Sequence, residues 1–315
     1  MRRVAILAFG LWIAATSAQA QISVVQGAPP VTDETKAALG KVRADGSREL
    51  YQLAEAGRID AQTYAGVLLA FRSDAEPDKR KGCGYLEAAS ATRSDAMHFL
   101  GEAYQYGRCG GRIDLEKAIT TFHKAGDMGL GKSRCAEGNV LLELGRDQAR
   151  AVRLCTEGAE MGDADAQTDV GNFYLSGRFV KKDAVAARGW YEKAVAQGHR
   201  NAAYTLGQIY WYGDGVAKDT AKAAQLWRLA YDQGRPDAAV LLGDEAMERA
   251  TRKLDANQLA AVGAGEAALD QAILSEALDW YEKALAAAPP QSRGQIEDRI
   301  KKAKLFKRPD SKGGA

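Results

Sequence analysis

The sequence predicts an all-α protein, a solenoid of stacked helix–turn–helix repeats. Three observations support this prediction: a glycine that recurs about every 36 residues, a second glycine nine residues before it, and apolar side chains at helical spacing around both. The first glycine, called here the landmark glycine, ends six similar segments and stands at Gly66, Gly101, Gly138, Gly171, Gly207 and Gly243. The earlier glycine stands at Gly57, Gly129, Gly162, Gly198 and Gly234, and is replaced by Thr92 in the second repeat.

Residues 1–20, MRRVAILAFGLWIAATSAQA, have the pattern of a signal peptide. Two arginines precede an apolar stretch, and Ala18 and Ala20 supply the small residues at −3 and −1 of a cleavage site. We expect cleavage near Ala20–Gln21 and a periplasmic or secreted protein, with no integral membrane segment after cleavage. The alternative is an uncleaved anchor, although the apolar stretch is shorter than the ~20 residues of a membrane span.

Charge argues against a nucleic-acid-binding protein. The whole chain has 43 Lys and Arg against 41 Asp and Glu, and loss of the two arginines in residues 1–20 leaves a neutral protein. Binding to nucleic acid depends on many contacts from basic residues to phosphates, so no nucleic-acid partner is expected. With 46% hydrophobic and 27% charged residues, the composition is that of an ordinary globular protein.

The elements follow in order along the chain. Residues 21–46 are expected to form a linker and a short helix from about Asp33, and residues 47–245 the repeat solenoid, beginning with a lone helix at 47–57. In each repeat, helix A carries the landmark glycine, which lets the next helix approach closely because it has no side chain. A glycine-rich turn follows, and helix B begins after a capping aspartate, as at Asp114, Asp183 and Asp219.

One well-defined repeat shows the expected core. The buried positions of helix A are Ala203, Leu206 and Tyr210, and those of helix B are Ala223, Trp227 and Ala230. In the third repeat the chain passes from Leu144-Gly145 almost directly to Asp147, so its turn is short.

The last repeat, residues 246–290, is interrupted by an alanine-rich insert of about 18 residues within 250–270, for which we expect an added helix. A closing helix at 275–290 ends at Pro289 and Pro290. Residues 291–315 are expected to form a basic helix and tail, with Ile296, Ile300 and Leu305 packed inward. The simple interpretation of this basic segment is a solvated cap at the end of the solenoid. The alternative is that its positive charge attracts anionic polymers of the cell envelope.

The pattern resembles the Sel1-like repeat family, relatives of the tetratricopeptide repeat. The resemblance is closest in AAYTLGQIYWYGDGVAKDTAKAAQLWRLAYDQG (202–234) and AQTDVGNFYLSGRFVKKDAVAARGWYEKAVAQGH (166–199), and it covers about 58–245. It implies a right-handed α-solenoid that binds other proteins and is not itself an enzyme. The family also includes cysteine-rich bacterial members with disulfide-linked repeats, although at other cysteine positions.

Four cysteines allow three pairings. Cys135 and Cys155 both replace core residues on the facing helices of one repeat, which favours a disulfide between them. The complementary pair is Cys83–Cys109, at one edge of adjacent repeats. A zinc site is disfavoured because no C-x-x-C spacing occurs.

The sequence contains no recognisable catalytic or cofactor motif. S-x-x-K, K-T-G, G-x-S-x-G and phosphate-binding glycine motifs are absent, so we assign no catalytic residue, no cofactor and no metal site. His98 has the register of a core residue on helix A. A hydrolase acting on β-lactam-like substrates, a role discussed for cysteine-rich relatives, is the least favoured class.

The candidate partner-binding groove follows from the register of helix A. If positions −4, −1 and +3 from the landmark glycine face the core, then −2, +1 and +5 line the concave side; we call these the A-helix face. Position +1 holds Asn139, Asn172 and Gln208 in three consecutive repeats, and amides can bond to an extended peptide backbone of any sequence. The aromatic and acidic residues expected beside this row are Tyr64, Phe71, Phe99, Tyr106, Tyr212, Glu102 and Asp244.

The sequence therefore favours a non-enzymatic periplasmic adaptor that binds a protein or peptide segment in this groove. The resemblance suggests roles in envelope signalling, polysaccharide export or host interaction, without separating them. The alternative is a carbohydrate or peptidoglycan-fragment binder, in which Tyr106, Trp211 and Tyr212 stack on sugar rings. The groove itself could also be only a solvated surface.

Overall fold

The computed structural model describes residues 28–42, 47–252 and 269–306, and every regular element in these ranges is an α-helix. The chain forms two compact units, residues 1–163 (unit 1) and 164–315 (unit 2). The described helices of unit 1 are α1 (Asp33–Lys41), α2 (Arg48–Glu55), α3 (Ile59–Arg72), α4 (Glu76–Ser90), α5 (Ser94–Gln105), α6 (Leu115–Asp127), α7 (Gly131–Glu143) and α8 (Gln148–Glu160). Those of unit 2 are α9 (Ala164–Ser176), α10 (Ala184–Ala196), α11 (Arg200–Tyr212), α12 (Thr220–Asp232), α13 (Ala238–Thr251), α15 (Gln271–Ala287) and α16 (Pro290–Leu305).

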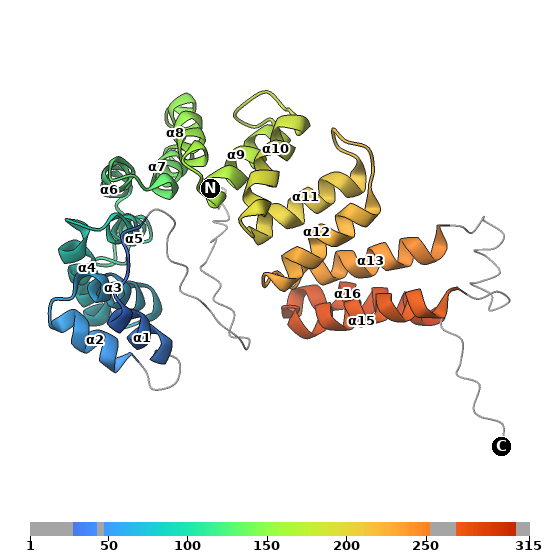
Figure 1. Cartoon of the computed structure of the whole chain (residues 1–315), viewed down its shortest axis with the longest axis horizontal. Coiled ribbons are helices and arrows are strands. Elements are labelled where there is room, and N and C mark those ends of the chain that lie inside the picture. The colour runs from blue at the N-terminus through green and yellow to red at the C-terminus, as the bar shows by residue number, and fades with distance from the viewer. Residues whose placement is uncertain (1–27, 43–46, 253–268, 307–315) are drawn as a thin grey trace, which may run out of the picture. The chain divides into compact units, whose positions relative to one another are not determined.

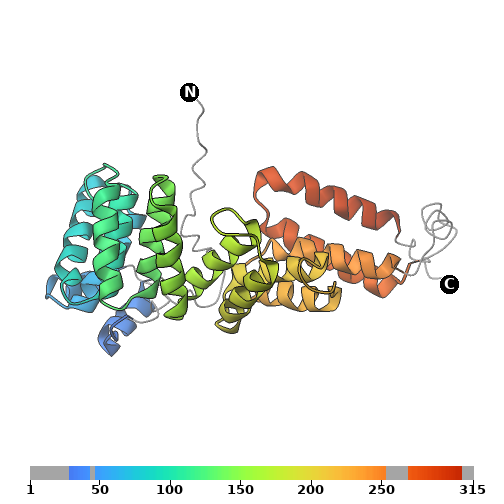
Figure 2. The same cartoon turned by 90° about the horizontal axis from the view of Figure 1, so that it is seen from above.

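Within each unit, consecutive helices pack in pairs, as Figures 1 and 2 show. In unit 1 the pairs are α3 with α4, α5 with α6, and α7 with α8; in unit 2 they are α9 with α10, α11 with α12, and α13 with α15. The first helix of each pair is the expected helix A and the second is helix B. The helix–turn–helix repeat is thus confirmed, and the expected short helix near Asp33 and lone helix near 47–57 are α1 and α2.

The landmark glycines set the distance between paired helices. A Cβ atom added at Gly207 would lie 2.4 Å from Nε1 of Trp227, and one at Gly171 would lie 2.9 Å from Cε1 of Tyr191. Both distances are below any normal carbon contact, so glycine is required where helix B approaches. The earlier glycines end their helices with φ between 77° and 94°, a left-handed conformation that glycine adopts without strain.

The helix caps are also as expected. The side chains of Asp114, Asp183 and Asp219 accept hydrogen bonds from first-turn amides of α6, α10 and α12. In the third repeat, where the turn is short, Asp147 caps α8 in the same way, although its φ is +35°. Each cap satisfies an amide that the helix leaves unpaired, so each fixes where a helix B begins.

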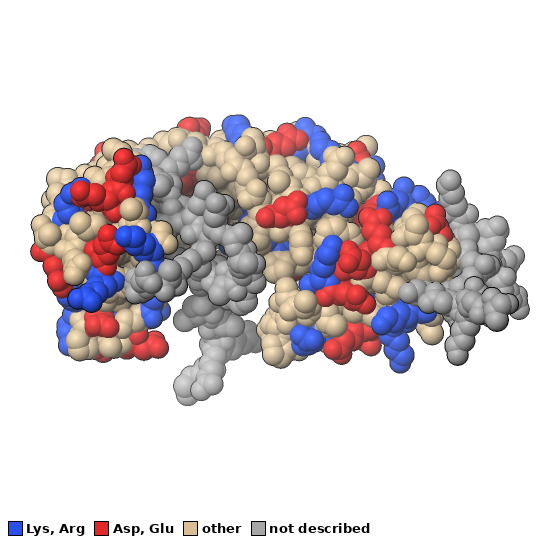
Figure 3. All heavy atoms as spheres, turned by 60° about the horizontal axis from the view of Figure 1, so that its bottom comes forward, with Lys and Arg blue, Asp and Glu red and all other residues tan. Residues whose placement is uncertain are grey.

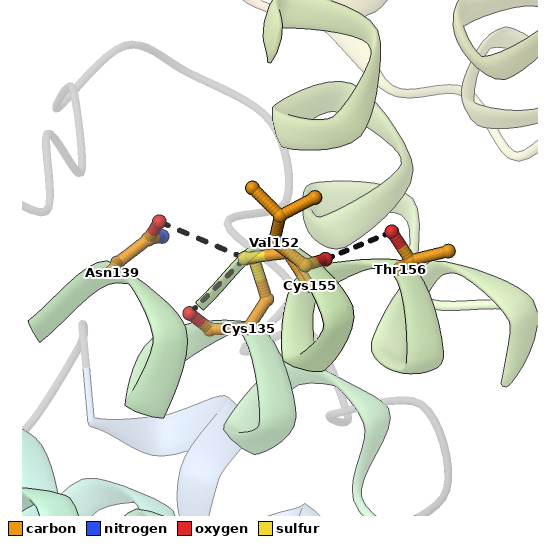
Figure 4. Close-up of a disulfide and its surroundings, with 5 residues drawn as sticks. All are labelled: Cys135, Asn139, Val152, Cys155 and Thr156. Atoms are coloured by element: carbon orange, nitrogen blue, oxygen red, sulfur yellow. Dashed lines mark hydrogen bonds between the residues drawn. A yellow bond between two sulfur atoms is a disulfide. The ribbon is translucent and has the colours of Figure 1, made fainter. Parts of the chain in front are cut away.

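The four cysteines form two disulfides in unit 1, Cys83–Cys109 and Cys135–Cys155. These are the two pairs that the repeat register favoured. Cys135–Cys155 links α7 to α8 within one repeat, and Sγ of Cys155 lies 3.8 Å from Oδ1 of Asn139 on α7 (Figure 4). Cys83–Cys109 ties α4 to the turn after α5, so both covalent links reinforce contacts between neighbouring helices.

The C-terminal end of unit 2 corrects one expectation. α15 ends before Pro289, and α16 buries Ile296 and Ile300 as predicted, but Leu305 is 70% exposed. Ala303 is buried instead, because it continues the i, i+4, i+7 stripe of the two isoleucines, whereas Leu305 falls on the opposite side. The expected signal peptide, most of the 250–270 insert and the end of the basic tail lie outside the described residues.

Basic and acidic side chains are interspersed on the face of the described residues shown in Figure 3. This mixture agrees with the small formal net charge of +2 and gives the surface in view no single sign. None of the described helices combines the length and apolar character needed to cross a membrane.

Candidate functional site

The row of amides on the A-helix face is accessible. Asn139 on α7 and Asn172 on α9 are exposed, and Gln208 on α11 is half-buried. Asn172 and Gln208 belong to successive A helices of unit 2, whereas Asn139 belongs to unit 1. Their joint action on one ligand remains a prediction.

In two repeats of unit 2, the side chain at position +1 also accepts a hydrogen bond from a tyrosine of helix B. The sequence did not indicate these hydrogen bonds. The hydroxyl of Tyr191 donates to Oδ1 of Asn172 at 2.7 Å, and the hydroxyl of Tyr281 donates to Oδ1 of Asp244 at 2.8 Å. Burial raises the pKa of both tyrosines, so each hydroxyl stays protonated and remains a donor at neutral pH. These bonds orient Asn172 and Asp244 before any ligand arrives.

The predicted aromatic residues fall into three groups. Tyr106 and Tyr212 are 50% and 74% exposed, so they are available as anchors. Phe71 and Phe99 are half-buried and pack against the cluster formed by α3, α4 and α5. Tyr64 is only 3% exposed, so the expectation that it is an open anchor is wrong; it packs in one cluster with Val31.

The two acidic candidates are engaged by neighbouring side chains. A carboxylate oxygen of Glu102 lies 3.4 Å from Nε2 of His98, and Asp244 pairs with Arg299 of α16, with Nε and Oδ1 2.9 Å apart. Trp211, a candidate for stacking on sugars, packs against the ring of Trp227 at a centroid distance of 5.4 Å. These three side chains are therefore already part of the packed structure.

A segment of the chain itself lies at the N-terminal ends of the A helices α3 and α5 in unit 1. Residues 28–32, called here the N-terminal segment, lie against α3 and α5 just before α1 (Figure 1). The amide and hydroxyl of Thr32 donate to Oδ2 of Asp60 at 2.8 and 2.7 Å. Nη1 and Nη2 of Arg93 donate to the carbonyl oxygens of Pro30 and Pro29 at 3.1 and 2.9 Å. We call the surface between these two side chains the Asp60–Arg93 site.

The electrostatics of this site are well defined. Nε and Nη2 of Arg93 donate to the two carboxylate oxygens of Asp95, and both residues are buried, at 5% and 0% exposure. Burial alone would raise the pKa of Asp60, but hydrogen bonds from Thr32, Thr35 and the amide of Ala61 lower it. Asp60 is therefore ionised at neutral pH, as an acceptor of two bonds from Thr32 requires.

The same positions recur along the chain, which is the signal that could have revealed the site. Relative to the landmark glycine, positions −8 and −6 are Arg58 and Asp60, Arg93 and Asp95, and Arg235 and Asp237. In unit 2, Arg235 likewise binds Asp237, and its guanidinium stacks over the ring of Tyr204 at 3.7 Å. These two positions lie outside the −2, +1 and +5 positions from which the groove is predicted.

The histidines occupy structural positions. His98 is buried, as expected, with Nδ1 2.9 Å from Oγ of Ser133. Nδ1 of His123 lies 3.0 Å from Oε2 of the buried Glu137, and Nε2 of His199 lies 2.9 Å from Oδ1 of Asp165. Among the described residues, no group of three or more His, Cys, Asp or Glu side chains is placed to hold a metal ion.

Comparison with known proteins identifies the family. The model described as Sel1 repeat matches residues 59–91, 94–130, 136–163, 164–199, 200–234 and 274–288, more than half of the chain. The chain belongs to the Sel1 repeat family. The matched ranges include the first and third repeats, in which the sequence pattern is weakest, and the Sel1 assignment confirms the predicted α-solenoid class.

Individual relatives are more distant. A Sel1 repeat protein from Oxalobacter formigenes has 22% identity and a TM-score of 0.51, covering 81% of this chain and 99% of that one. The protective antigen c5321 of uropathogenic Escherichia coli has 20% identity and a TM-score of 0.49, covering 87% of this chain and 65% of that one. An F-box protein of Arabidopsis thaliana, At1g70590, is 31% identical over 104 residues, which are 33% of this chain and 29% of that protein. The present chain thus spans less than a third of the length of the Arabidopsis protein. The similarities to the two solved structures concern the fold.

Proposed function

We propose that this protein is a non-enzymatic scaffold that binds an extended segment of another protein on the A-helix faces of its Sel1 repeats. The observation that carries the proposal is the N-terminal segment, which is held by its backbone at the N-terminal ends of the A helices α3 and α5, with Val31 in one cluster with Tyr64 of the A-helix face. Two of its carbonyl groups accept from Arg93 and one amide donates to Asp60. Recognition of this kind depends on backbone groups and one or two side chains, so it suits a partner of limited sequence similarity to the segment.

Further repeats offer the same kind of surface. Asn172 is oriented by Tyr191 and stays exposed, and Tyr212 is 74% exposed at the end of the next A helix. An oriented amide loses little freedom on binding, and a rigid aromatic ring supplies apolar contact area. These features support Asn139, Asn172 and Gln208 as backbone-binding groups, with Tyr106 and Tyr212 as anchors.

An exported location forms part of the proposal. The charged and apolar pattern of residues 1–20 supports it, and so do the two disulfides, because disulfides persist in oxidising compartments such as the periplasm. The partner is then a protein of the cell envelope or one met outside the cell.

Site-specific photo-crosslinking in intact cells tests the function. A photoreactive phenylalanine analogue replaces Tyr212 on the A-helix face or, as the matched control, Gln225, which is exposed on α12 away from its buried stripe. We expect a discrete protein adduct from position 212 only, and its yield should fall at least fivefold when Asn172→Ala and Gln208→Ala are added. Adducts of equal yield from both positions, or an adduct with glycan alone, would contradict the proposal; the second outcome would favour the carbohydrate-binding alternative.

A further inference from the structure

We infer that the Asp60–Arg93 site is an exchangeable docking site, which residues 29–32 occupy as a built-in competitor and which an extended Pro-Pro-aliphatic-Thr segment of a partner protein takes in their place. The inference rests on the proposed function and adds to it the chemistry of the partner segment and a means of control.

The contacts define which segment fits. Pro29 and Pro30 offer carbonyl oxygens to Arg93, and their rings fix φ, so this stretch is held extended before it docks. Val31 is 7% exposed and packs in the cluster that contains Tyr64. Thr32 then supplies two donors to Asp60. The site therefore favours a segment that presents, in order along its chain, two carbonyl acceptors for Arg93, one aliphatic side chain and one residue with two hydrogen-bond donors for Asp60.

The Arg93 side of the site is held independently of its occupant. Asp95 is 0% exposed and holds the guanidinium of Arg93 through two hydrogen bonds, at 3.0 and 2.7 Å, that do not involve the N-terminal segment. The remaining N–H groups of Arg93 face the segment and need acceptors there. A buried guanidinium fixed in this orientation is a preorganised binding group, which lowers the entropy lost on docking.

In unit 2 the side chains at the same positions have different partners. The residue equivalent to Arg93 is Arg235, and the residue equivalent to Asp60 is Asn201. There the two bond directly, with Nη1 of Arg235 donating to Oδ1 of Asn201 at 2.8 Å. In unit 1, Arg93 and Asp60 both bond to the N-terminal segment instead. The segment therefore lies where the equivalent side chains of unit 2 bond directly to each other.

The attachment of the segment is suited to exchange. Its side chains contribute one buried group, Val31, whereas Pro30 is exposed and Pro29 is half-buried. A tethered segment has an effective concentration on the order of millimolar, so a free ligand of the same chemistry competes poorly until the tethered one is weakened. Weakening the segment should therefore raise the affinity for an added peptide at least tenfold.

The test uses the full chain and a fluorescent peptide, Ala-Pro-Pro-Val-Thr-Asp, which copies residues 28–33. Its binding is measured by fluorescence anisotropy to the wild type and to the double variant Val31→Ser, Thr32→Ala. A second variant, Pro29→Gly with Pro30→Gly, keeps both of those side chains and loosens only the backbone. Circular dichroism first confirms that each variant retains the helix content and melting behaviour of the repeats.

We expect both variants to bind the peptide at least tenfold more tightly than the wild type does. Peptides with Ala-Ala in place of Pro-Pro, or with the order scrambled, should bind at least tenfold more weakly to the variants. Equal affinity for the wild type and both variants would show that the segment does not compete, and equal affinity for the scrambled peptide would remove the assigned chemistry. No binding to any form would overturn the docking site, while crosslinking at position 212 would still decide the proposed function separately.

Discussion

Replacement of Gly207 by alanine tests the packing on which every repeat depends. The added Cβ would lie 2.4 Å from Nε1 and 2.6 Å from Cδ1 of Trp227, whereas ordinary contacts begin at 3.4 Å. The indole must therefore move by about 1 Å relative to α11. Trp227 is 1% exposed and its Nε1 donates to the carbonyl oxygen of Tyr204 at 3.1 Å, so that movement disturbs both the core and a hydrogen bond.

Three contributions set the size of the effect. Alanine favours a helix over glycine by about 0.5–1 kcal/mol. Overpacking a core costs about 1–3 kcal/mol, and loss of one hydrogen bond costs about 0.5–1.5 kcal/mol. We expect Gly207→Ala to lower the free energy of unfolding of unit 2 by about 2 kcal/mol, since the unfavourable contributions exceed the gain in helix propensity.

Gly189→Ala is the matched control, because Gly189 lies inside α10 and an added Cβ there meets no atom within 4 Å. This variant should gain about 0.5–1 kcal/mol. Urea unfolding followed by tryptophan fluorescence suits the comparison, since all four tryptophans after residue 20 lie in unit 2. With a slope of about 2 kcal/mol per molar urea, Gly207→Ala should lower the midpoint by about 1 M. A Gly207→Ala variant as stable as Gly189→Ala would refute the close-packing argument.

Three further predictions concern stability. Cys135→Ser with Cys155→Ser should cost about 3 kcal/mol, since the disulfide closes a loop of 20 residues, and unchanged melting would contradict this. Reduction also opens Cys83–Cys109, so reduced wild type and the reduced double variant should melt alike, below the oxidised double variant. Asp219→Ala should cost about 1 kcal/mol by removing the cap of α12, whereas Asp232→Ala at the other end of α12 should cost nothing. Burial raises the pKa of Glu245, so the wild type loses stability as pH rises from about 4.5 through that raised pKa. Glu245→Gln should therefore melt above the wild type at pH 7 and level with it near pH 4, and the opposite trend would exclude the assigned burial effect.

The repeat fold could be predicted because its signals are local. Each landmark glycine, each helix-ending glycine and each capping aspartate acts within its own helix pair, so one aligned repeat describes the others. The cysteine pairing followed from the same register, because Cys135 and Cys155 stand at core positions of facing helices. The prediction that Leu305 packs inward was wrong for a different reason. The buried stripe of α16 runs from Ile296 through Ile300 to Ala303, and Leu305 lies on the opposite side of the helix.

The candidate site was less predictable because it depends on contacts between distant segments. Tyr64 has the register of an exposed residue, but it is buried in a cluster that also contains Val31, Ala38 of α1 and Leu50 of α2, all of which precede the first repeat. The Asp60–Arg93 site likewise needs a segment that lies outside the repeats. The recurring Arg and Asp at −8 and −6 were visible in the sequence, but their bonds to Pro29 and Pro30 were not.

The side chain opposite each landmark glycine varies, although the glycine does not. Along the chain it is Leu86, Phe122, Cys155, Tyr191, Trp227 and Tyr281. Only the tyrosines carry a hydroxyl that reaches through to Asn172 or Asp244. Each of these hydroxyls fixes the orientation of the side chain at position +1 from the B helix. Under the proposed function, Tyr191→Phe should therefore alter ligand selectivity without changing any atom that the ligand touches.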